Sequence, residues 1–267
     1  MNPVEQYYDE HVEREWAREK RHPMEFAVTR RAFDEFLPAP PLEILDVGGG
    51  PGRYALELAQ RGYHVTLFDL ARACLEFAER QAQATNLVLA DFVHGDATDL
   101  GQFADARFDA VLLLGPLYHL TAPEARRQAV REAARVLKPH GLVLASIITR
   151  YAPLRFAAKF DPAWLTADPA RCARLLEAGV PTLEPTPGGF TVAHFAHPTE
   201  LEPLMRAAGF ETRALIAVEG IVSGIDDALN AASQEIWQAW VELNYRLGRD
   251  SSVHGAADHV LYVGQRP

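Results

Sequence analysis

The sequence is poor in cysteine and has no long hydrophobic run. Its two cysteines, Cys74 and Cys172, lie far apart without metal-type spacing, which excludes a disulfide framework and favours a reduced cytoplasmic setting. No apolar run approaches the roughly 18 residues of a membrane-spanning helix. Residues 1–16 are charged and lack the apolar segment of a signal peptide. We therefore expect a cytoplasmic protein with no membrane partner.

Positive charge is also scarce. The chain has 26 Lys and Arg against 36 Asp and Glu, a net charge of −10, and contains no Lys/Arg block. Nucleic acids bind mainly through clustered positive charge, so this balance argues against a nucleic-acid partner, although a local basic groove stays open. The hydrophobic content of 48% suffices for one large core, or for a core with a small cap.

Proline marks the expected boundaries between units. Residues 1–39 are predicted to be a helical N-terminal segment, which the prolines of LPAPP at 37–41 end because they fix φ and remove donors. Residues 150–199 are dense in proline and aromatics and contain PGG at 187–189, which predicts an inserted helical and aromatic cap with flexible joints. The core is expected over 40–149 and 200–267.

Within the expected core, short apolar runs alternate with amphipathic segments. Continuously apolar strands separated by helices indicate a parallel sheet covered on both faces, a doubly wound α/β fold. The predicted strands are LEILDV (42–47), YHVTLFDL (63–70), LVLADFVHGDA (87–97), FDAVLLLG (108–115), LVLASIIT (142–149), ETRALIAVEG (211–220) and DHVLYVGQ (258–265).

The sequence GGGPG at 48–52 stands between the first predicted strand and its helix, at the sheet edge where such folds bind ligands. Dinucleotide-binding enzymes carry G-x-G-x-x-G there, but Arg53 occupies the position of the third glycine. The pattern G-x-x-x-x-G-K is absent from the sequence, which excludes a P-loop.

The spacing D-x-G-x-G-x-G, which begins at Asp46, resembles the first motif of class I S-adenosylmethionine-dependent methyltransferases. The resemblance extends over residues 42–146: Asp69 ends the second strand, Asp96 ends the third, LLLGPLYHL follows the fourth, and RVLKPHGLVLAS is similar to the closing helix–strand signature. It implies a Rossmann-like, mostly parallel seven-stranded sheet, S-adenosylmethionine as cofactor and S-adenosylhomocysteine as product.

The resemblance also implies roles for particular residues. Asp69 is expected to accept the ribose hydroxyls and Asp96 to lie near the adenine amine, whereas Asp46 is expected to hold the amides of the glycine loop. From the residues alone, Asp69 is also a candidate helix N-cap and Asp96 a candidate turn residue. The expected cofactor-binding residues are Asp46, Gly48, Gly49, Gly50, Asp69, Leu70, Asp96, Ala97, Leu114, Gly115, Tyr8 and Arg14; no metal is expected.

The acceptor is expected to meet the enzyme near residues 114–119. Methyltransferases of nucleic-acid bases and of glutamine carry [D/N]-P-P-[Y/F] here, and this chain has Leu-Gly-Pro-Leu-Tyr instead, which favours another small-molecule acceptor. His119 is the candidate base for a hydroxyl or thiol, or alternatively a helix cap, and Tyr118 is a candidate wall of the site. We slightly favour oxygen as the methylated atom.

Two aromatic groups remain open in their role. Tyr7, Tyr8, Arg14 and Trp16 are expected either to close over the cofactor, with Arg14 binding the methionine carboxylate, or to form a solvated helix packed on the sheet. The aromatics of the insertion are expected either to line an apolar acceptor pocket or to form the core of the cap itself; they are Tyr151, Phe156, Phe160, Trp164, Phe190 and Phe195.

The sequence favours a methyltransferase that is a monomer or a homodimer. A non-catalytic module that binds S-adenosylmethionine for regulation is the alternative from another class. A dinucleotide-dependent oxidoreductase is a third, weakened by the glycine spacing.

Overall fold

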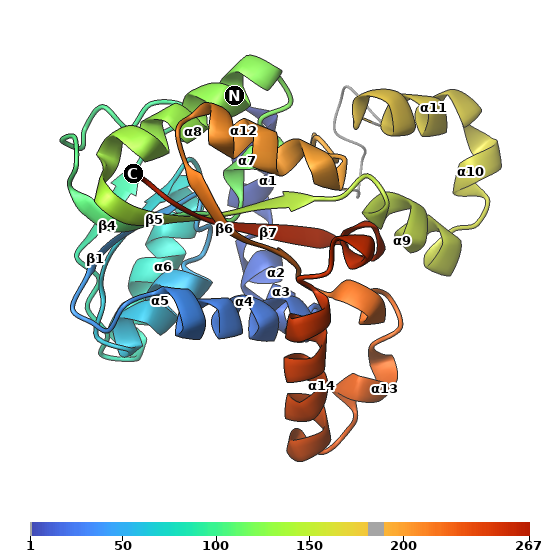
Figure 1. Ribbon diagram of the computed structural model, residues 1–267, viewed down its shortest axis with the longest axis horizontal. Helices are drawn as coiled ribbons and strands as arrows, with labels where there is room; N and C mark the ends of the chain where they lie inside the picture. Colours follow the sequence, from blue (N-terminus) through green and yellow to red (C-terminus); the bar gives the residue numbers. More distant parts are fainter. Residues whose placement is uncertain (1, 181–189) are drawn as a thin grey trace.

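A computed structural model describes residues 2–180 and 190–267 of the chain. These residues form a seven-stranded sheet in the order β3-β2-β1-β4-β5-β7-β6, with helices on both faces (Figure 1). β1 to β5 run parallel, and β7 pairs antiparallel with both β5 and β6. The doubly wound, mostly parallel α/β fold is therefore confirmed. The strands are β1 (Glu43–Val47), β2 (His64–Asp69), β3 (Asp91–His94), β4 (Phe108–Leu113), β5 (Leu137–Ile148), β6 (Glu211–Ala217) and β7 (His259–Gln265).

The continuous apolar runs follow from burial on both faces of the sheet. On β1, Ile44 packs into one hydrophobic cluster while Leu45 and Val47 pack into the other, because successive side chains of a strand point to opposite faces. The first cluster includes α4 (Pro23–Phe36), α5 (Arg53–Gln60), α6 (Arg72–Ala84) and α14 (Gln234–Leu247). The second includes α7 (Pro116–His119), α8 (Pro123–Val136) and α12 (Leu201–Ala207).

The N-terminal segment forms four helices rather than one. α1 (Pro3–Glu10), α2 (Val12–Trp16) and α3 (Arg18–Arg21) precede α4, with non-helical backbone at His11 and His22. α4 ends at Phe36, directly before the proline-rich stretch. Each interruption turns the next helix, so the segment wraps along the sheet edge instead of extending from it (Figure 1).

The insertion leaves the sheet at the end of β5 and divides into two parts. Helices α9 (Ala152–Phe160), α10 (Trp164–Ala167) and α11 (Pro169–Ala178) lie to one side of the sheet (Figure 1). The chain then comes back along β5 through residues 190–197, called here the return limb, where Ala196 pairs with Thr149. The PGG sequence at 187–189 lies outside the described residues.

The C-terminal part completes the sheet. After α12, the chain runs through β6, α13 (Asp227–Asn230) and α14 to β7. Short 3₁₀ turns join these elements, namely η1 (Pro198–Glu200), η2 (Gly220–Val222) and η3 (Ser251–Ala256). Of the helices that the structure describes, none combines the length and apolar character that crossing a membrane requires.

Candidate active site

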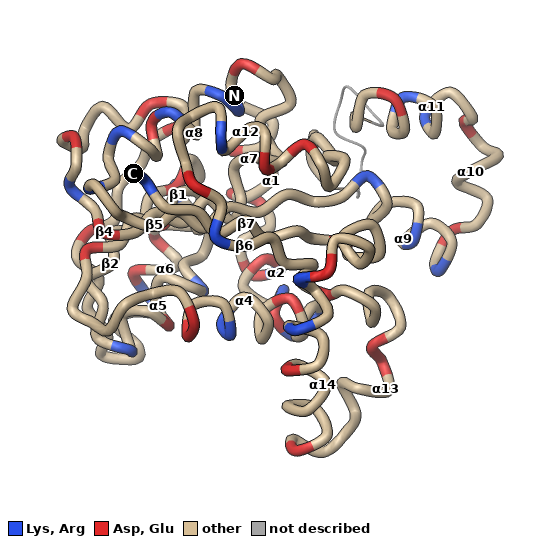
Figure 2. Tube along the Cα trace, in the orientation of Figure 1, with Lys and Arg blue, Asp and Glu red and all other residues tan. Residues whose placement is uncertain are grey.

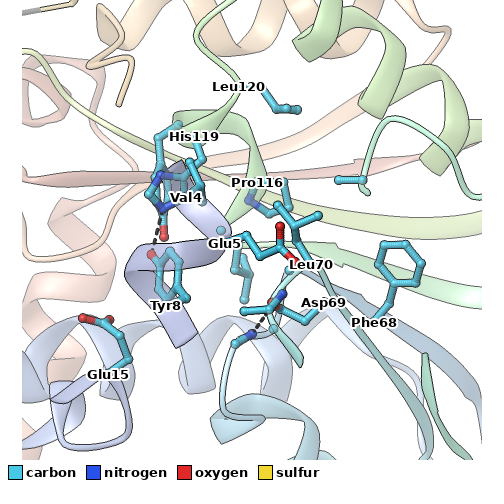
Figure 3. A pocket seen from close by; sticks show the side chains of 18 of the residues that line it. Val4, Glu5, Tyr8, Glu15, Phe68, Asp69, Leu70, Pro116, His119 and Leu120 are labelled. Carbon is cyan, nitrogen blue, oxygen red and sulfur yellow. Dashed lines mark hydrogen bonds between the residues drawn. The ribbon is translucent and has the colours of Figure 1, made fainter. Parts of the chain in front are cut away.

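A cavity of about 560 Å³ opens at the carboxyl edge of the sheet. Its walls come from the N-terminal helices, the glycine loop, the ends of β2, β3 and β4, the start of α8 and one residue of the return limb, Val192. This is the crevice where the strand order reverses between β1 and β4, the position at which open α/β sheets bind ligands. Figure 3 shows the side chains that converge there.

The glycine loop connects β1 to α5 and forms the floor of the cavity. Gly48 has φ +67°, and a Cβ on it would lie 2.6 Å from Pro116 Cγ, so the loop needs glycine there to pass beneath α7. Gly50 has φ +55°, and a Cβ on it would meet nothing within 4 Å. The backbone at Gly50 therefore faces open space, which leaves room for a ligand to approach it closely.

Asp69 stands at the end of β2 and joins the glycine loop to the chain before α6. Its Oδ2 accepts a hydrogen bond from the Gly50 amide at 2.7 Å, and its Oδ1 accepts one from the Ala71 amide at 2.8 Å. Burial raises the pKa of Asp69 to about 6, against the opposing effect of these amides. Ala71, not Asp69, precedes the helix as its N-cap, so the N-cap alternative for Asp69 is wrong.

Asp46, at the end of β1, is 1% exposed. Its Oδ2 has no hydrogen-bond partner in the described part of the chain, although it lines the cavity. Burial and the charge of Asp69 raise the pKa of Asp46 to about 7. A buried carboxyl oxygen that has no hydrogen-bond partner destabilises the folded state. A positively charged ligand group in the cavity would offset that loss of stability.

The ends of β3 and β4 supply the remaining expected walls. Asp96 Oδ1 accepts hydrogen bonds from the Thr98 amide and hydroxyl at 2.8 and 2.7 Å, so the turn role expected for Asp96 is present and its other oxygen has no hydrogen-bond partner among the described residues. Leu70, Ala97, Leu114 and Gly115 also line the cavity. Together these residues fit a nucleoside, with carboxylates at two neighbouring strand ends.

His119 and Tyr8 meet across the cavity although 111 residues separate them. Tyr8 Oη lies 2.7 Å from His119 Nε2, and His119 Nδ1 lies 3.3 Å from the carbonyl oxygen of Val192. Because a carbonyl only accepts, Nδ1 carries the proton and Nε2 accepts from the Tyr8 hydroxyl. Burial lowers the pKa of His119 to about 4, so the imidazole is neutral at physiological pH.

Tyr118 forms the wall next to this pair. It is 4% exposed and its carbonyl accepts a hydrogen bond from the His194 amide at 2.7 Å. Burial raises the pKa of its phenol, so Tyr118 does not ionise near neutral pH. The rings of Tyr118 and His119 lie edge to face, with centroids 4.7 Å apart.

The sequence predicts a cofactor-binding role for Arg14, but the structure places Arg14 outside the cavity. Arg14 is exposed and does not line the cavity, whereas Arg18 on the next helix does. The break before α3 changes the face that points inward, so one helical turn separates the expected residue from the observed one. Arg18 donates to Glu25 and to His259 Nε2 through Nη2, both at 2.9 Å.

A cluster of three titratable side chains lies beneath Arg18. It consists of Glu25, Glu219 and His259, and one carboxylate oxygen or ring nitrogen from each lies within 4.8 Å of the others. His259 Nδ1 lies 2.5 Å from Glu219 Oε1. The Arg18 guanidinium contacts both Glu25 and His259 and so supplies the positive charge that this cluster needs. The arrangement is explained as an ion-pair network that holds Arg18 in place.

Of the insertion's described residues, Val192 lines the cavity. Phe156 and Phe160 on α9 are 65% and 62% exposed, so they form neither a pocket wall nor a cap core. Phe190 packs its ring against Tyr7 and His119 with centroids 5.8 and 5.4 Å apart. None of the remaining expected cap aromatics, which are Tyr151, Trp164 and Phe195, lines the cavity in the described structure.

Several residues that line the cavity were not predicted from the sequence, among them Glu15, Arg18 and Val192. Trp16, by contrast, is directed to the core, where it packs on Phe77 with centroids 5.4 Å apart and beneath the guanidinium of Arg53 at 3.8 Å. Glu15 and Arg18 lie three residues apart on either side of Trp16. The spacing of this Glu-x-x-Arg pattern was the signal available in the sequence.

Comparisons with known proteins agree with this site. Residues 44–141 match the family model described as "Methyltransferase domain". The chain is 38% identical over 112 residues to the demethylmenaquinone methyltransferase of Clavibacter sepedonicus, and 28% identical over 181 residues to the ubiquinone biosynthesis O-methyltransferase of Maricaulis maris. The matches span 42% and 66% of this chain, and 43% and 62% of those relatives.

A solved structure supports the fold over a longer stretch. The structure from Methanosarcina mazei described as SAM-dependent methyltransferases has a TM-score of 0.62 and 22% identity, covering 88% of this chain and 96% of that chain. In this chain the glycine loop and the carboxylates at or just beyond the ends of β1, β2 and β3 lie on that same fold. The chain therefore contains a methyltransferase domain over residues 44–141, on the fold of the class I S-adenosylmethionine-dependent methyltransferases.

Proposed function

We propose that this protein methylates a small-molecule acceptor at an oxygen atom by in-line transfer from S-adenosylmethionine. The observation that carries the proposal is the single cavity that joins the glycine loop to the Tyr8–His119 pair. Bound S-adenosylmethionine supplies a methyl group activated by its positively charged sulfur. The protein then has mainly to align the acceptor with that methyl group, a contribution of up to about 7–11 kcal/mol.

The residues of the cavity divide into those that hold the cofactor and those that hold the acceptor. In this proposal Asp69 accepts the ribose hydroxyls, Asp96 lies by the adenine, and Gly50 allows the close approach of the nucleoside. The Arg18 guanidinium binds the methionine carboxylate, and the unpartnered Oδ2 of Asp46 accepts from the methionine amino group. The cofactor methyl group then points toward Tyr8 and His119.

The Tyr8–His119 pair provides a path for the acceptor proton. As the acceptor oxygen attacks, its proton passes to Tyr8 Oη while the Tyr8 hydroxyl proton passes to His119 Nε2, and the imidazolium later releases its proton to water. Nδ1 stays protonated and bonded to the Val192 carbonyl throughout. This relay explains why a neutral histidine is held with its Nε2 lone pair directed at a phenol.

A small acceptor is supported by the shape and charge of the molecule. Helix α1 and the return limb cover the cavity, and Thr191 Oγ1 of the limb donates to the Pro3 carbonyl of α1. Figure 2 shows basic residues interspersed with acidic ones along the trace, without the continuous basic stripe that nucleic acids favour. Both curated relatives above are named for quinone biosynthesis.

The competing acceptor is a nucleic acid. The tRNA 5-carboxymethoxyuridine methyltransferase of Escherichia coli is 30% identical over 103 residues, which is 38% of either chain. We favour the small molecule because α1 and the return limb cover part of the cavity and because Leu114–Tyr118 lacks the polar group that base methyltransferases use. The proposal further takes the protein to be cytoplasmic, consistent with two unpaired cysteines, to act without nucleic acid or a membrane, and to be a monomer or homodimer.

Incubation with labelled S-adenosylmethionine tests the proposal. The enzyme is mixed separately with a metabolite extract, a nucleic-acid pool and a protein pool, and the label in each is counted. We expect incorporation into metabolites. Preferential labelling of a macromolecular pool contradicts the proposal, and cofactor binding without turnover in any pool supports the regulatory alternative. Tighter binding of NAD than of S-adenosylhomocysteine in a calorimetric titration supports the oxidoreductase.

Two variants test the proton path. Tyr8→Phe and His119→Asn should each lower kcat by about 10²-fold, with the Kd of S-adenosylhomocysteine unchanged. Tyr7→Phe is the matched control, because the Tyr7 hydroxyl stands on the same helix without lining the cavity. Equal rates for Tyr8→Phe and the control exclude the relay.

A further inference from the structure

The cavity holds more negative charge than the protein itself neutralises. Two of its carboxylates are paired with the arginines that line it, Glu25 with Arg18 at 2.9 Å and Glu19 with Arg53. Glu5 and Glu15 also line the cavity and have no hydrogen-bond or ion-pair partner in the described part of the chain. Their charges are therefore left for ligands to compensate.

The cofactor accounts for only part of this charge. Its positive groups are the sulfonium and the methionine amino group, and the structure already offers Asp46 Oδ2, a buried acceptor that has no partner among the described residues. Glu5 lies toward the Asp69 side of the cavity, whereas Glu15 lies beside Tyr8 on the opposite side (Figure 3). Glu15 therefore faces the acceptor end.

The surroundings of Glu15 suit an ammonium group. Burial first, and the charges of Tyr118 and Glu15 next, raise the pKa of Tyr8, so Glu15 is close enough to act on the phenol that faces the acceptor. Tyr8 and Tyr118 contribute aromatic rings to the same wall. A carboxylate next to aromatic rings is the combination that binds organic cations, through ion pairing and cation–π attraction.

We propose that the acceptor carries a protonated amino group, which Glu15 binds while the acceptor hydroxyl lies at the Tyr8–His119 pair. This inference rests on the proposed function and narrows its substrate class to small hydroxylated amines. A protonated amine has no lone pair and cannot accept a methyl group, so holding it at Glu15 directs transfer to the oxygen. The ion pair positions the acceptor and leaves the chemistry to the other end of the molecule.

The first experiment detects the natural acceptor in an extract and does not require its identity in advance. A metabolite extract is incubated with the enzyme and labelled S-adenosylmethionine, and the products are separated by cation exchange at pH 7. We expect the labelled product in the cationic fraction. Label confined to the neutral or anionic fractions overturns the inference but leaves the proposed function intact, whereas no label in any metabolite fraction is the failure of the proposed function.

The second experiment assigns the preference to Glu15. Tyramine, its neutral analogue 2-(4-hydroxyphenyl)ethanol and its anionic analogue 4-hydroxyphenylacetate are titrated into protein saturated with S-adenosylhomocysteine. We expect tyramine to bind at least tenfold more tightly than the other two, and we expect Glu15→Gln to remove that difference. Glu13→Gln, an exposed glutamate on the same helix, should retain it.

Three results of the titration overturn the inference. The first is equal or tighter binding of either analogue to the wild-type protein, and the second is an unchanged preference in Glu15→Gln. The third is a loss of more than tenfold in S-adenosylhomocysteine affinity on Glu15→Gln, because it places Glu15 on the methionine amino group instead of on the acceptor.

Discussion

Asp69 already holds the glycine loop before any ligand arrives, since its two oxygens accept from the amides of Gly50 and Ala71. The same carboxylate still has lone pairs for a ribose. Asp69→Asn keeps one acceptor for the loop and removes the charge, so we expect cofactor affinity to fall by about 1.5–3 kcal/mol, the range for hydrogen bonds to charged groups. Calorimetric titration with S-adenosylhomocysteine measures the loss.

The control for this variant is Glu76→Gln on α6, an exposed residue outside the cavity. It should bind the cofactor product like the wild type. Circular dichroism of Asp69→Asn distinguishes a lost contact from a lost fold. Wild-type affinity in a folded Asp69→Asn protein shows that the ribose is bound elsewhere.

Asp46 is a buried residue whose ionisation lowers the stability of the folded protein. Its pKa of about 7 exceeds the unfolded value of 3.8, so between these values the native state binds the extra proton and stability falls as pH rises. Asp46→Asn removes this penalty, and its stabilising effect should be about 2 kcal/mol larger at pH 8 than at pH 5. Urea unfolding of the free protein at both pH values provides the measurement.

Asp91→Asn serves as the matched control, because Asp91 is an exposed aspartate at the start of β3. Its effect should not differ between the two pH values. S-adenosylmethionine affinity of Asp46→Asn should fall if Asp46 accepts from the methionine amino group. A variant that loses stability equally at pH 5 and pH 8 contradicts the assigned pKa shift.

At the scale of elements, α1 depends on polar and ring contacts instead of a core. All residues of α1 are described, and none of them is buried. Its anchors are the Tyr8–His119 bond, the Ala73 amide to Asp9 at 2.9 Å, the Thr191–Pro3 bond and the Tyr7–Phe190 ring contact. These contacts join it to α6, α7 and the return limb. We expect such a helix to open more easily than one with a buried apolar face.

Hydrogen exchange tests this weak docking. The amides of α1 should exchange much faster than those of α4, which buries Met24, Val28 and Phe33 and belongs to the same N-terminal segment. S-adenosylhomocysteine should slow exchange in α1 and leave α4 unchanged. Equal protection of α1 and α4 in the free protein shows that α1 is part of the stable core.

The N-terminal segment also shows what the sequence can and cannot predict. Its helical character follows from composition, and Pro23 marks the break at His22. No proline or glycine marks the break at His11. Each break changes which face points inward. Arg18 consequently lines the cavity and Arg14 does not, while Tyr8 lies in the cavity as predicted.

The core elements were predictable because one local pattern fixed each of them. The apolar runs, the glycine loop and the carboxylates at strand ends are all short-range signals, and residues 46–50, 69–70, 96–97 and 114–119 converge on the cavity accordingly. The path of the return limb could not be predicted from a local pattern. His119 meets Val192 across 73 residues, and no periodicity within either segment indicates that contact.

At the scale of the whole molecule, the insertion was predicted as one cap, and the structure divides its described part in two. Helices α9–α11 contribute nothing to the cavity lining and bury only Ala157 and Leu175 among their described side chains. The return limb contacts Tyr118 and His119 through backbone hydrogen bonds and contributes Val192. Of the described part of the insertion, it is therefore the limb that reaches the cavity.

Two deletions separate these parts. Replacing residues 152–189 with a Gly/Ser linker of about ten residues, enough to span roughly 30 Å, retains the limb and every lining residue of the cavity. We expect this variant to bind S-adenosylhomocysteine within about tenfold of wild type, or 1.4 kcal/mol, and to keep its turnover.

A second variant that extends the replacement through residue 195 also removes Val192 and the His194 bond to Tyr118. It should bind the cofactor product similarly and lose turnover, because His119 loses the carbonyl that fixes its tautomer and α1 loses its contacts with Phe190 and Thr191. Loss of turnover in the first variant, with its fold and cofactor binding retained, shows that α9–α11 take part in acceptor binding, and full turnover in the second removes the limb from the site.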